Sequence, residues 1–279
     1  MDLPDLDALA AVVAEGGVAV LSGAGLSTES GIPDYRGPSG AARPSTPMTY
    51  QTFTGSAAAR RRYWARSHLG WRVIARAEPN AGHRAVAALQ DASLLTGVIT
   101  QNVDGLHTGG GARDVVELHG NLDRVICLGC GRLSPRADLD RRLRAVNRAW
   151  RARVLAVNPD GDVDLPKQDL DAFRTVDCDV CGGVLKPDVV FFGETVPADR
   201  VAACFALVES ARSLVVLGSS LTVMSGYRFV LHAAKRGTPV AIVNAGPTRG
   251  DAKAQVRVDG PLGVVLPNLV DRLGTVRTG

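Results

Sequence analysis

Short apolar runs alternate with amphipathic segments along most of the chain. The first amphipathic segment carries Leu6, Leu9 and Val13 at helical spacing and ends at a glycine pair. Further helices are expected over Ala57–Ile74, over residues 81–92, from about Ala198 and from Tyr227. Apolar runs predict strands at residues 18–21, 94–100, 114–120, 188–194, 213–220 and 239–244. Apolar strands that alternate with helices indicate an α/β protein with a Rossmann-like, doubly wound parallel sheet.

Composition narrows the class of protein further. The 279 residues can form one large domain, or a domain with a smaller module. A net charge of +4, spread along the chain, argues against a specific nucleic-acid partner. No apolar run approaches the roughly 20 residues that cross a bilayer, and the acidic start lacks a basic targeting region. We therefore expect a cytoplasmic protein without a membrane partner.

Four of the five cysteines form two C-x-x-C pairs, Cys127 with Cys130 and Cys178 with Cys181. Without a secretory signal, disulfides are the weaker explanation, and a redox dithiol would need only one pair. Four thiolates suffice to close a tetrahedral zinc site, so we predict one structural zinc ion. Cys204 lies in an apolar helical stretch and is expected to be an inert buried thiol.

A long insert, residues 131–177, separates the two cysteine pairs. Leu139, Leu143, Val146 and Trp150 form one helical stripe there, with arginines on the other positions. The arginines allow a basic face for nucleic acid, but we favour a docked amphipathic helix with solvated arginines. Residues 158–166 are rich in turn formers, and their carboxylates have the wrong spacing for an EF-hand, so a loop is predicted.

The first strand runs into a glycine turn, Gly23-Ala24-Gly25. The dinucleotide fingerprint G-x-G-x-x-G is incomplete because Thr28 replaces its third glycine, and no Walker motif follows. Three further predicted strands also end in polar or glycine residues, after Thr100, Leu217 and Val243. Such residues at the carboxyl edge of a parallel sheet suit a dinucleotide, since glycines admit phosphates and Ser, Asn or Gln bind ribose hydroxyls.

His119 ends the predicted strand at residues 114–120 and precedes Gly120. A lone histidine is more often structural than catalytic. His119 nevertheless lies at the probable ligand edge and near the first cysteine pair, so it can serve as a general base near neutral pH.

Taken together, these segments resemble a known family, the sirtuins, which are NAD-dependent protein deacylases. The resemblance spans nearly the whole chain in the family's order and lies closest to the class II branch. It rests on the segments GAGLS (23–27), GIPDYR (31–36), TQNVD (100–104), HG (119–120), both cysteine pairs, FGE (192–194), GSSL (218–221) and Asn244.

The resemblance implies an NAD co-substrate and acyl-lysine proteins as substrates. The implied NAD-binding residues are Gly23, Ala24, Gly25, Ser27, Thr28, Asp34, Tyr35, Arg36, Gln101, Asn102, Asp104, Gly218, Ser219, Ser220, Asn244 and Leu262. Relatives often carry a cysteine where Leu262 stands, so only a backbone contact is expected there. The acyl-lysine carbonyl oxygen would attack the nicotinamide-ribose C1′ and expel nicotinamide. His119 would then act as general base on the ribose hydroxyls, giving free lysine and O-acyl-ADP-ribose.

The resemblance also implies how the substrate binds. The peptide is expected to add as a strand beside Val190, Phe191, Phe192, Gly193, Glu194 and the stretch that includes Leu221. Tyr63 and Arg66 lie three apart on a predicted helix, and in desuccinylating sirtuins such a pair reads the carboxylate of an acidic acyl chain. Arginines crowd this stretch, so the spacing can also be chance.

Three functions remain open at the level of sequence: a lysine deacylase, an ADP-ribosyltransferase that uses the same pocket, and a non-enzymatic ADP-ribose or nucleic-acid module. A base beside Asn102 and Asp104 argues against the third. The predicted domains are an NAD-binding domain, residues 1–125 and 188–279 with a helical insert at about 40–80, and a zinc-binding module, residues 126–187. The sequence does not predict the oligomeric state.

Overall fold

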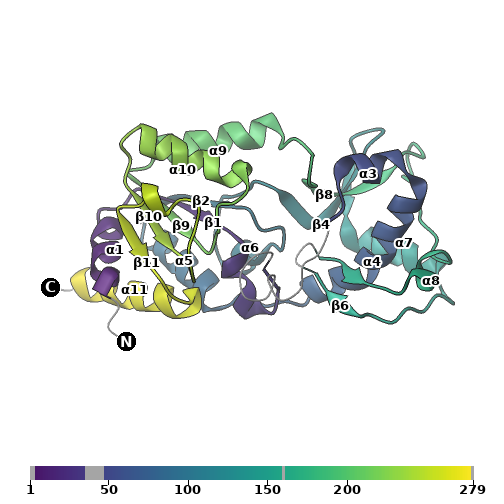
Figure 1. Cartoon of the computed structure of the whole chain (residues 1–279), viewed down its shortest axis with the longest axis horizontal. Coiled ribbons are helices and arrows are strands. Elements are labelled where there is room, and N and C mark those ends of the chain that lie inside the picture. Colours follow the sequence, from purple (N-terminus) through teal and green to yellow (C-terminus); the bar gives the residue numbers. More distant parts are fainter. Residues whose placement is uncertain (1–3, 35–46, 159–160, 278–279) are drawn as a thin grey trace.

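The computed structural model describes residues 4–34, 47–158 and 161–277, which form two lobes joined side by side (Figure 1). The large lobe contains a six-stranded sheet, and the small lobe contains a three-stranded sheet with several helices. Among the described residues, no helix combines the length and apolarity needed to cross a bilayer.

The sheet of the large lobe is entirely parallel, in the order β11-β10-β9-β1-β2-β3. Its strands are β1 (Val18–Ser22), β2 (Leu95–Thr100), β3 (Val115–Glu117), β9 (Ser213–Leu217), β10 (Val240–Val243) and β11 (Val256–Val258). β1, β9 and β10 are buried along their whole length, as their continuous apolar runs predict. β11 was not predicted, because three residues carry too little pattern to be recognised.

Helices cover both faces of this sheet. Successive side chains of β1 alternate between two cores: Val18 and Val20 pack with one helix layer, and Ala19 and Leu21 with the other. The first layer comprises α1 (Pro4–Ala14), α5 (Ala81–Asp91) and α11 (Leu262–Arg277). The second layer comprises α9 (Ala198–Ser210) and α10 (Met224–Lys235). The doubly wound sheet predicted from the sequence is therefore confirmed. The large lobe also contains two short elements, α6 (Leu106–Gly109) and η3 (Asp251–Lys253).

The small lobe is built on an antiparallel sheet in the order β5-β4-β8. Its elements are α3 (Tyr50–Gly55), α4 (Ala57–Ile74), β4 (Gly120–Cys127), β5 (Leu133–Pro135), α7 (Arg136–Val146), β6 (Ala156–Val157), β7 (Val163–Asp164), α8 (Lys167–Leu170) and β8 (Leu185–Val189). Side chains from α3 and α4 share one apolar core with side chains from the cysteine region, including Phe53, Trp64, Leu139 and Phe173. The helical insert thus packs with the cysteine-bearing segment.

Among the predicted elements that differ in the structure are one strand and one helix of the small lobe. The strand expected at residues 188–194 lies at 185–189, as β8, and pairs with β4 rather than with the parallel sheet. Pro187 is tolerated there because β8 is an edge strand. The predicted helical stripe in the insert stops at Val146, so Trp150 is not on α7. Asn147 ends the helix by donating its side-chain amide to the Leu143 carbonyl at 2.8 Å. Trp150 instead meets Phe173 edge to face, with 4.8 Å between the ring centroids.

Candidate active site

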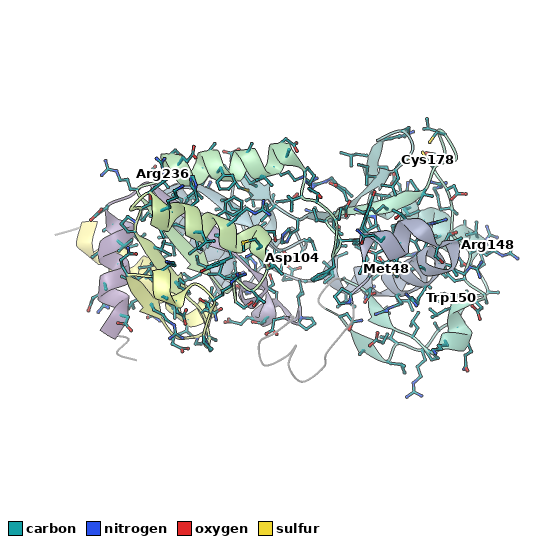
Figure 2. The ribbon with its side chains drawn as sticks, turned by 45° about the horizontal axis from the view of Figure 1, so that its top comes forward. Met48, Asp104, Arg148, Trp150, Cys178 and Arg236 are labelled. Atoms are coloured by element: carbon teal, nitrogen blue, oxygen red, sulfur yellow. The ribbon has the colours of Figure 1, made fainter. Side chains whose placement is uncertain are left out.

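A cavity of about 910 Å³ lies between the two lobes, at the carboxyl edge of the parallel sheet. This is the edge at which open α/β sheets bind ligands. Figure 2 places Asp104 on the large-lobe side and Met48 on the small-lobe side, and both residues line the cavity. A volume near the upper end of the range for small-molecule sites leaves room for a dinucleotide together with part of a second substrate.

The glycine turn after β1 is packed against the end of β9. Gly25 donates its N–H to the Gly218 carbonyl at 2.8 Å, and a Cβ on Gly25 would lie 2.9 Å from that oxygen. Any side chain at this position would therefore separate the two strand ends. The turn continues as two 3-10 helices, η1 (Ala24–Leu26) and η2 (Thr28–Ser30), rather than as a long helix. The Thr28 hydroxyl donates to the Gly25 carbonyl at 3.0 Å and so stabilises the turn.

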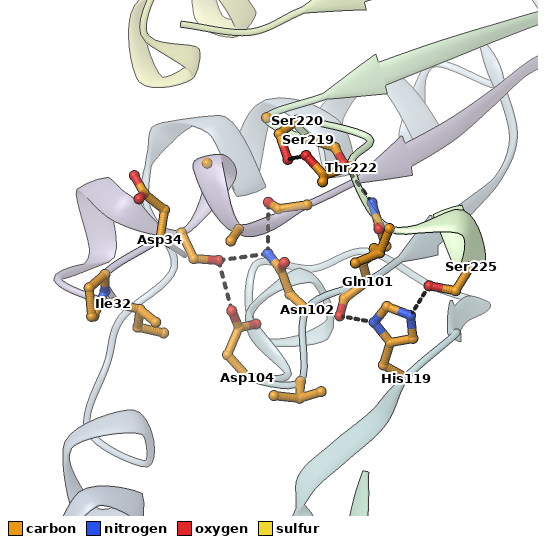
Figure 3. Close-up of a pocket in the computed structure, with 18 of the residues that line it drawn as sticks. Ile32, Asp34, Gln101, Asn102, Asp104, His119, Ser219, Ser220, Thr222 and Ser225 are labelled. Atoms are coloured by element: carbon orange, nitrogen blue, oxygen red, sulfur yellow. Dashed lines mark hydrogen bonds between the residues drawn. The ribbon is translucent and has the colours of Figure 1, made fainter. Parts of the chain in front are cut away.

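Polar side chains that follow β2 tie this turn to the neighbouring strands (Figure 3). Asn102 donates its side-chain amide to the Gly23 carbonyl at 3.1 Å and to the Ser27 hydroxyl at 3.0 Å. The Ser27 hydroxyl in turn donates to Asp104 at 2.7 Å. Gln101 reaches in the other direction and donates to the Ser219 hydroxyl at 2.8 Å. Three strand ends are thus fixed relative to one another before any ligand binds.

Asp104 is the acidic group of this network. Burial raises the pKa of its carboxyl group, and hydrogen bonds from the Leu106 N–H and the Ser27 hydroxyl oppose that shift. The carboxyl oxygens keep acceptor capacity beyond these two hydrogen bonds, so Asp104 can accept another from an amide or hydroxyl of a ligand.

His119 lies where the two sheets meet. β3 ends at Glu117 and β4 begins at Gly120, so His119 belongs to the two-residue connection between them. The prediction that His119 ends a strand was wrong. Gly120 makes this sharp passage possible: its φ is +85°, and a Cβ there would collide with the Asp188 carbonyl of β8. The imidazole therefore faces the cavity from the seam between the lobes.

The hydrogen bonds of His119 define its tautomer. Nδ1 lies 2.9 Å from the Gln101 carbonyl, and because a carbonyl can only accept, Nδ1 carries the proton. Nε2 is then the basic nitrogen and accepts from the Ser225 hydroxyl at 2.9 Å. Burial is the main cause that lowers the pKa of His119 below its usual 6.5. The ring is accordingly neutral at pH 7 and able to take up a proton at Nε2.

On the small-lobe side, the chain after β8 forms a compact loop. The Glu194 carboxylate accepts from the Phe191 N–H at 2.8 Å and pairs with Lys186 at 3.1 Å. Lys186 is buried, and its ammonium lies 4.8 Å from the centroid of the Phe191 ring. Burial lowers the pKa of this lysine, and the Glu194 charge opposes the shift. These contacts hold Phe191 and Gly193 on the cavity wall.

The two cysteine pairs converge at the far end of β4. The four sulfur atoms all lie within 4.8 Å of one another, with 3.5 Å between Cys127 and Cys181 and 3.9 Å between Cys130 and Cys178. The Gly129 and Gly183 N–H groups point at Cys127 and Cys181, each at 3.4 Å. This arrangement can hold a metal ion, and none of the four cysteines lines the cavity.

Comparison with known proteins places this architecture in a family. The model described as "Sir2 family" matches residues 23–225. The chain belongs to the Sir2 family. It is 62% identical to "NAD-dependent protein deacetylase 1" of Streptomyces coelicolor over 277 residues, which cover 98% of this chain and 93% of that protein.

Solved structures agree with this assignment. A structure described as "Sir2-p53 peptide-NAD+" superposes with a TM-score of 0.78 at 28% identity and covers 97% of this chain and 99% of the other. A second, a variant Sir2 with deacetylated p53 peptide and 3′-O-acetyl ADP-ribose, has a TM-score of 0.78 at 27% identity and covers 96% and 98%.

Nearly all residues predicted for the site lie on the cavity wall of this Sir2 protein. The described ones that line it are Gly23, Ala24, Gly25, Ser27, Thr28, Asp34, Tyr63, Gln101, Asn102, Asp104, His119, Val190, Phe191, Phe192, Gly193, Glu194, Gly218, Ser219, Ser220, Leu221, Asn244 and Leu262. Tyr35 and Arg36 lie outside the described residues. Placement on the wall is a finding, whereas the individual roles remain predictions.

Arg66 is the exception, because it does not line the cavity. Its guanidinium donates to Asp164 at 2.8 Å and to the Val163 carbonyl at 2.8 Å, and it pairs with Asp162 at 3.0 Å. Arg66 therefore already has carboxylate partners in this structure, whereas a pairing with an acidic acyl group was expected. Those partners lie almost a hundred residues away along the chain, and the Tyr-x-x-Arg spacing contains no information about them.

Ser225 and Lys186 were not predicted from the sequence. Ser225 comes from the first turn of α10 and contacts His119. Lys186 comes from β8 and pairs with Glu194. Both act through contacts to distant residues, which spacing along the chain cannot reveal.

Proposed function

We propose that this protein is an NAD-dependent protein-lysine deacylase that removes acetyl groups from lysine side chains and yields nicotinamide, free lysine and O-acyl-ADP-ribose. The observation that carries the proposal is the geometry of His119. Its unprotonated Nε2 faces a cavity whose large-lobe wall suits a dinucleotide and whose small-lobe wall suits a peptide. A binding module would need no such base.

The donor set of the large-lobe wall fits NAD. The two strand ends at Gly25 and Gly218 offer backbone close to the cavity, and Ser219, Ser220 and Asn244 offer hydroxyl and amide groups for ribose and phosphate oxygens. Asp104, held in place by the Ser27 hydroxyl and the Leu106 N–H, suits the nicotinamide carboxamide. When bound, NAD supplies an electrophilic ribose carbon once nicotinamide leaves.

The residues of this chain then have distinct tasks. Asn102 and Asp104 orient the nicotinamide half, because both are fixed through the Ser27 hydroxyl. His119 accepts a proton from a ribose hydroxyl at Nε2, and the Gln101 carbonyl steadies the imidazolium through Nδ1–H. Ser225 must release Nε2 or move aside as the proton arrives.

The acyl-lysine peptide is expected to lie along the wall formed by the segment after β8 and the segment after β9. β8 is an edge strand, and the cavity wall continues from it through Val190 and Phe191. Leu221 faces it from the large lobe. An extended peptide can therefore add its backbone to both segments and place its acyl-lysine between the lobes.

The cysteine cluster is proposed to hold one structural zinc ion. Four thiolates at about 2.3 Å from Zn²⁺ in tetrahedral geometry stand about 3.8 Å apart, close to the 3.5 and 3.9 Å observed here. Four protein ligands leave no position for water or substrate, so the ion would stabilise the small lobe and take no part in the reaction.

The test is product analysis with an acetyl-lysine peptide and NAD. We expect mass spectrometry to detect O-acetyl-ADP-ribose and deacetylated peptide in equal amounts, with nicotinamide released. The His119→Ala variant should lose this turnover while it still binds NAD. If ADP-ribose becomes attached to protein and no acetyl-ADP-ribose forms, the protein is an ADP-ribosyltransferase instead. A His119→Ala variant with half of the wild-type turnover would remove His119 as the base.

A further inference from the structure

Arg66 lies immediately behind the wall of the active-site cavity. A second, smaller cavity is lined by Arg66 together with Arg62, Thr49, Thr52, Pro47 and Met48. Pro47 and Met48 also line the main cavity, as does Tyr63, one helical turn before Arg66 on α4. The small cavity beside the guanidinium therefore shares part of its wall with the space proposed for the acyl chain.

The β6–β7 hairpin keeps the guanidinium on that side of the wall. Asp162 and Asp164 both bind it, and Asn158 donates its amide to the same two carboxylates, at 2.8 and 3.2 Å. Asp162 is nearly inaccessible, with 4% of its side chain exposed, whereas 50% of the Asp164 side chain is exposed. The aspartates are thus fixed by the hairpin as well as by Arg66.

The hairpin itself is packed firmly against the small lobe. A Cβ on Gly70 of α4 would lie 2.6 Å from the Asp162 backbone, and a Cβ on Gly161 would collide with Leu122. Leu122 lines the main cavity. The Asp162 backbone is therefore packed against α4, next to a residue of the cavity wall.

The charges in this cluster work against an acidic acyl chain. The Arg66 guanidinium is already paired with two carboxylates. An incoming carboxylate would have to take Arg66 from partners that are already in place. A neutral acyl chain does not meet this obstacle.

We propose that Asp162 and Asp164 determine acyl specificity: they hold Arg66 away from the acyl site and so favour neutral acyl chains over acidic ones. The proposal rests on the deacylase function proposed above. It assigns a role in specificity to the insert between the cysteine pairs, and it makes Arg66 a latent carboxylate-binding group instead of an active one.

The test uses Asp164→Asn as the main variant, because the half-exposed Asp164 can lose its charge with little risk to the fold. Asp138→Asn is the matched control: it removes the same charge from the same lobe, at an exposed position on α7 paired with Arg141. Peptides carrying acetyl-, pentanoyl- and glutaryl-lysine are compared, since pentanoyl matches the glutaryl chain without its carboxylate. Dissociation constants are measured by fluorescence anisotropy without NAD, and kcat/KM is measured with NAD.

We expect Asp164→Asn to raise the glutaryl-to-pentanoyl ratio of affinity by about tenfold, the size of one recovered charge-assisted contact. Asp138→Asn should leave the ratio unchanged, and adding Arg66→Met to Asp164→Asn should abolish the gain. An unchanged ratio in Asp164→Asn, or a gain that survives Arg66→Met, overturns the proposal. The binding measurement keeps it separate from the proposed function, which fails if acetyl peptide binds but NAD-dependent turnover is absent.

Discussion

A buried histidine pair beneath the active site predicts that the protein loses stability in mild acid. The rings of His83 and His107 lie 5.2 Å apart, and both are almost wholly inaccessible. His83 Nδ1 accepts from the Asn80 N–H, so its proton is on Nε2. The Ser22 hydroxyl donates to Thr100, so it accepts from His107 Nε2, and His107 Nδ1 is unprotonated. An added proton on His83 would break its hydrogen bond with Asn80, and one on His107 Nδ1 would be a buried N–H without an acceptor.

The magnitude follows from the pKa values. Burial, aided by the nearby Arg84 charge, lowers the pKa of His83 to about 4, and burial together with His83 lowers the pKa of His107 to about 3. Below pH 6.5 the two histidines bind protons in the unfolded chain but not in the folded chain, where their pKa values are lower. The free energy of unfolding therefore falls as the pH drops from 6.5 towards these values. At pH 5 each histidine costs about 2 kcal/mol, so the pair costs about 4 kcal/mol relative to pH 7.5. That is a large part of the roughly 5–15 kcal/mol that stabilises an ordinary domain.

Urea unfolding at pH 7.5 and pH 5.0, followed by circular dichroism, measures this difference. We expect His107→Gln to recover about half of the acid-induced loss, since glutamine can still donate to Ser22 but does not titrate in this range. Ser22→Ala is the matched control: it removes the hydrogen-bond partner of His107 and should lower stability at both pH values by similar amounts. A His107→Gln variant with the same pH dependence as the wild type would refute the reasoning.

Three further predictions concern the site and the metal cluster. Ser225→Ala should shift the acid limb of the kcat/KM–pH profile to higher pH, because the serine hydroxyl stabilises neutral His119; an unshifted limb contradicts this. Cys178→Ser should remove stoichiometric metal and lower the unfolding temperature, measured by atomic emission and calorimetry; a wild type without bound zinc rules out the zinc assignment. Gly25→Ala should cost about 1–3 kcal/mol and raise the KM for NAD, because its Cβ meets the Gly218 carbonyl; unchanged stability and KM would disprove the close packing.

The large lobe could be predicted from the sequence because each of its longer strands and helices has a recognisable hydrophobic pattern of its own. Strands buried on both sides are continuous apolar runs, and each lies next to a helix whose pattern has a different period. The small lobe was predicted less well because its elements are short and paired at a distance. β5, β6 and β7 have two or three residues each, and β8 carries Pro187, which argues against a strand unless the edge position is known.

In the site too, features that depend on neighbouring residues were predicted, and features that depend on distant residues were not. The residues that follow β1, β2 and β9 were predicted to gather because the carboxyl ends of parallel strands share one edge. His119 was placed correctly on the cavity wall but in the wrong element, since its strand ends two residues earlier and a second sheet begins after it. The partner of its basic nitrogen, Ser225, is 106 residues away, so its tautomer could only be read from the structure.

Arg66 shows most clearly why a pair of residues at the right spacing does not define a specificity. The helix fixes Tyr63 and Arg66 on one face, and that much follows from sequence. Whether the guanidinium is available to a ligand depends on which carboxylates fold against it, and here they come from a hairpin between the two cysteine pairs. On the proposal made above, two proteins with the same Tyr-x-x-Arg pair differ in acyl preference if their inserts differ. The charge of the insert, as well as the motif on the helix, has to be compared when acyl preference is inferred within this family.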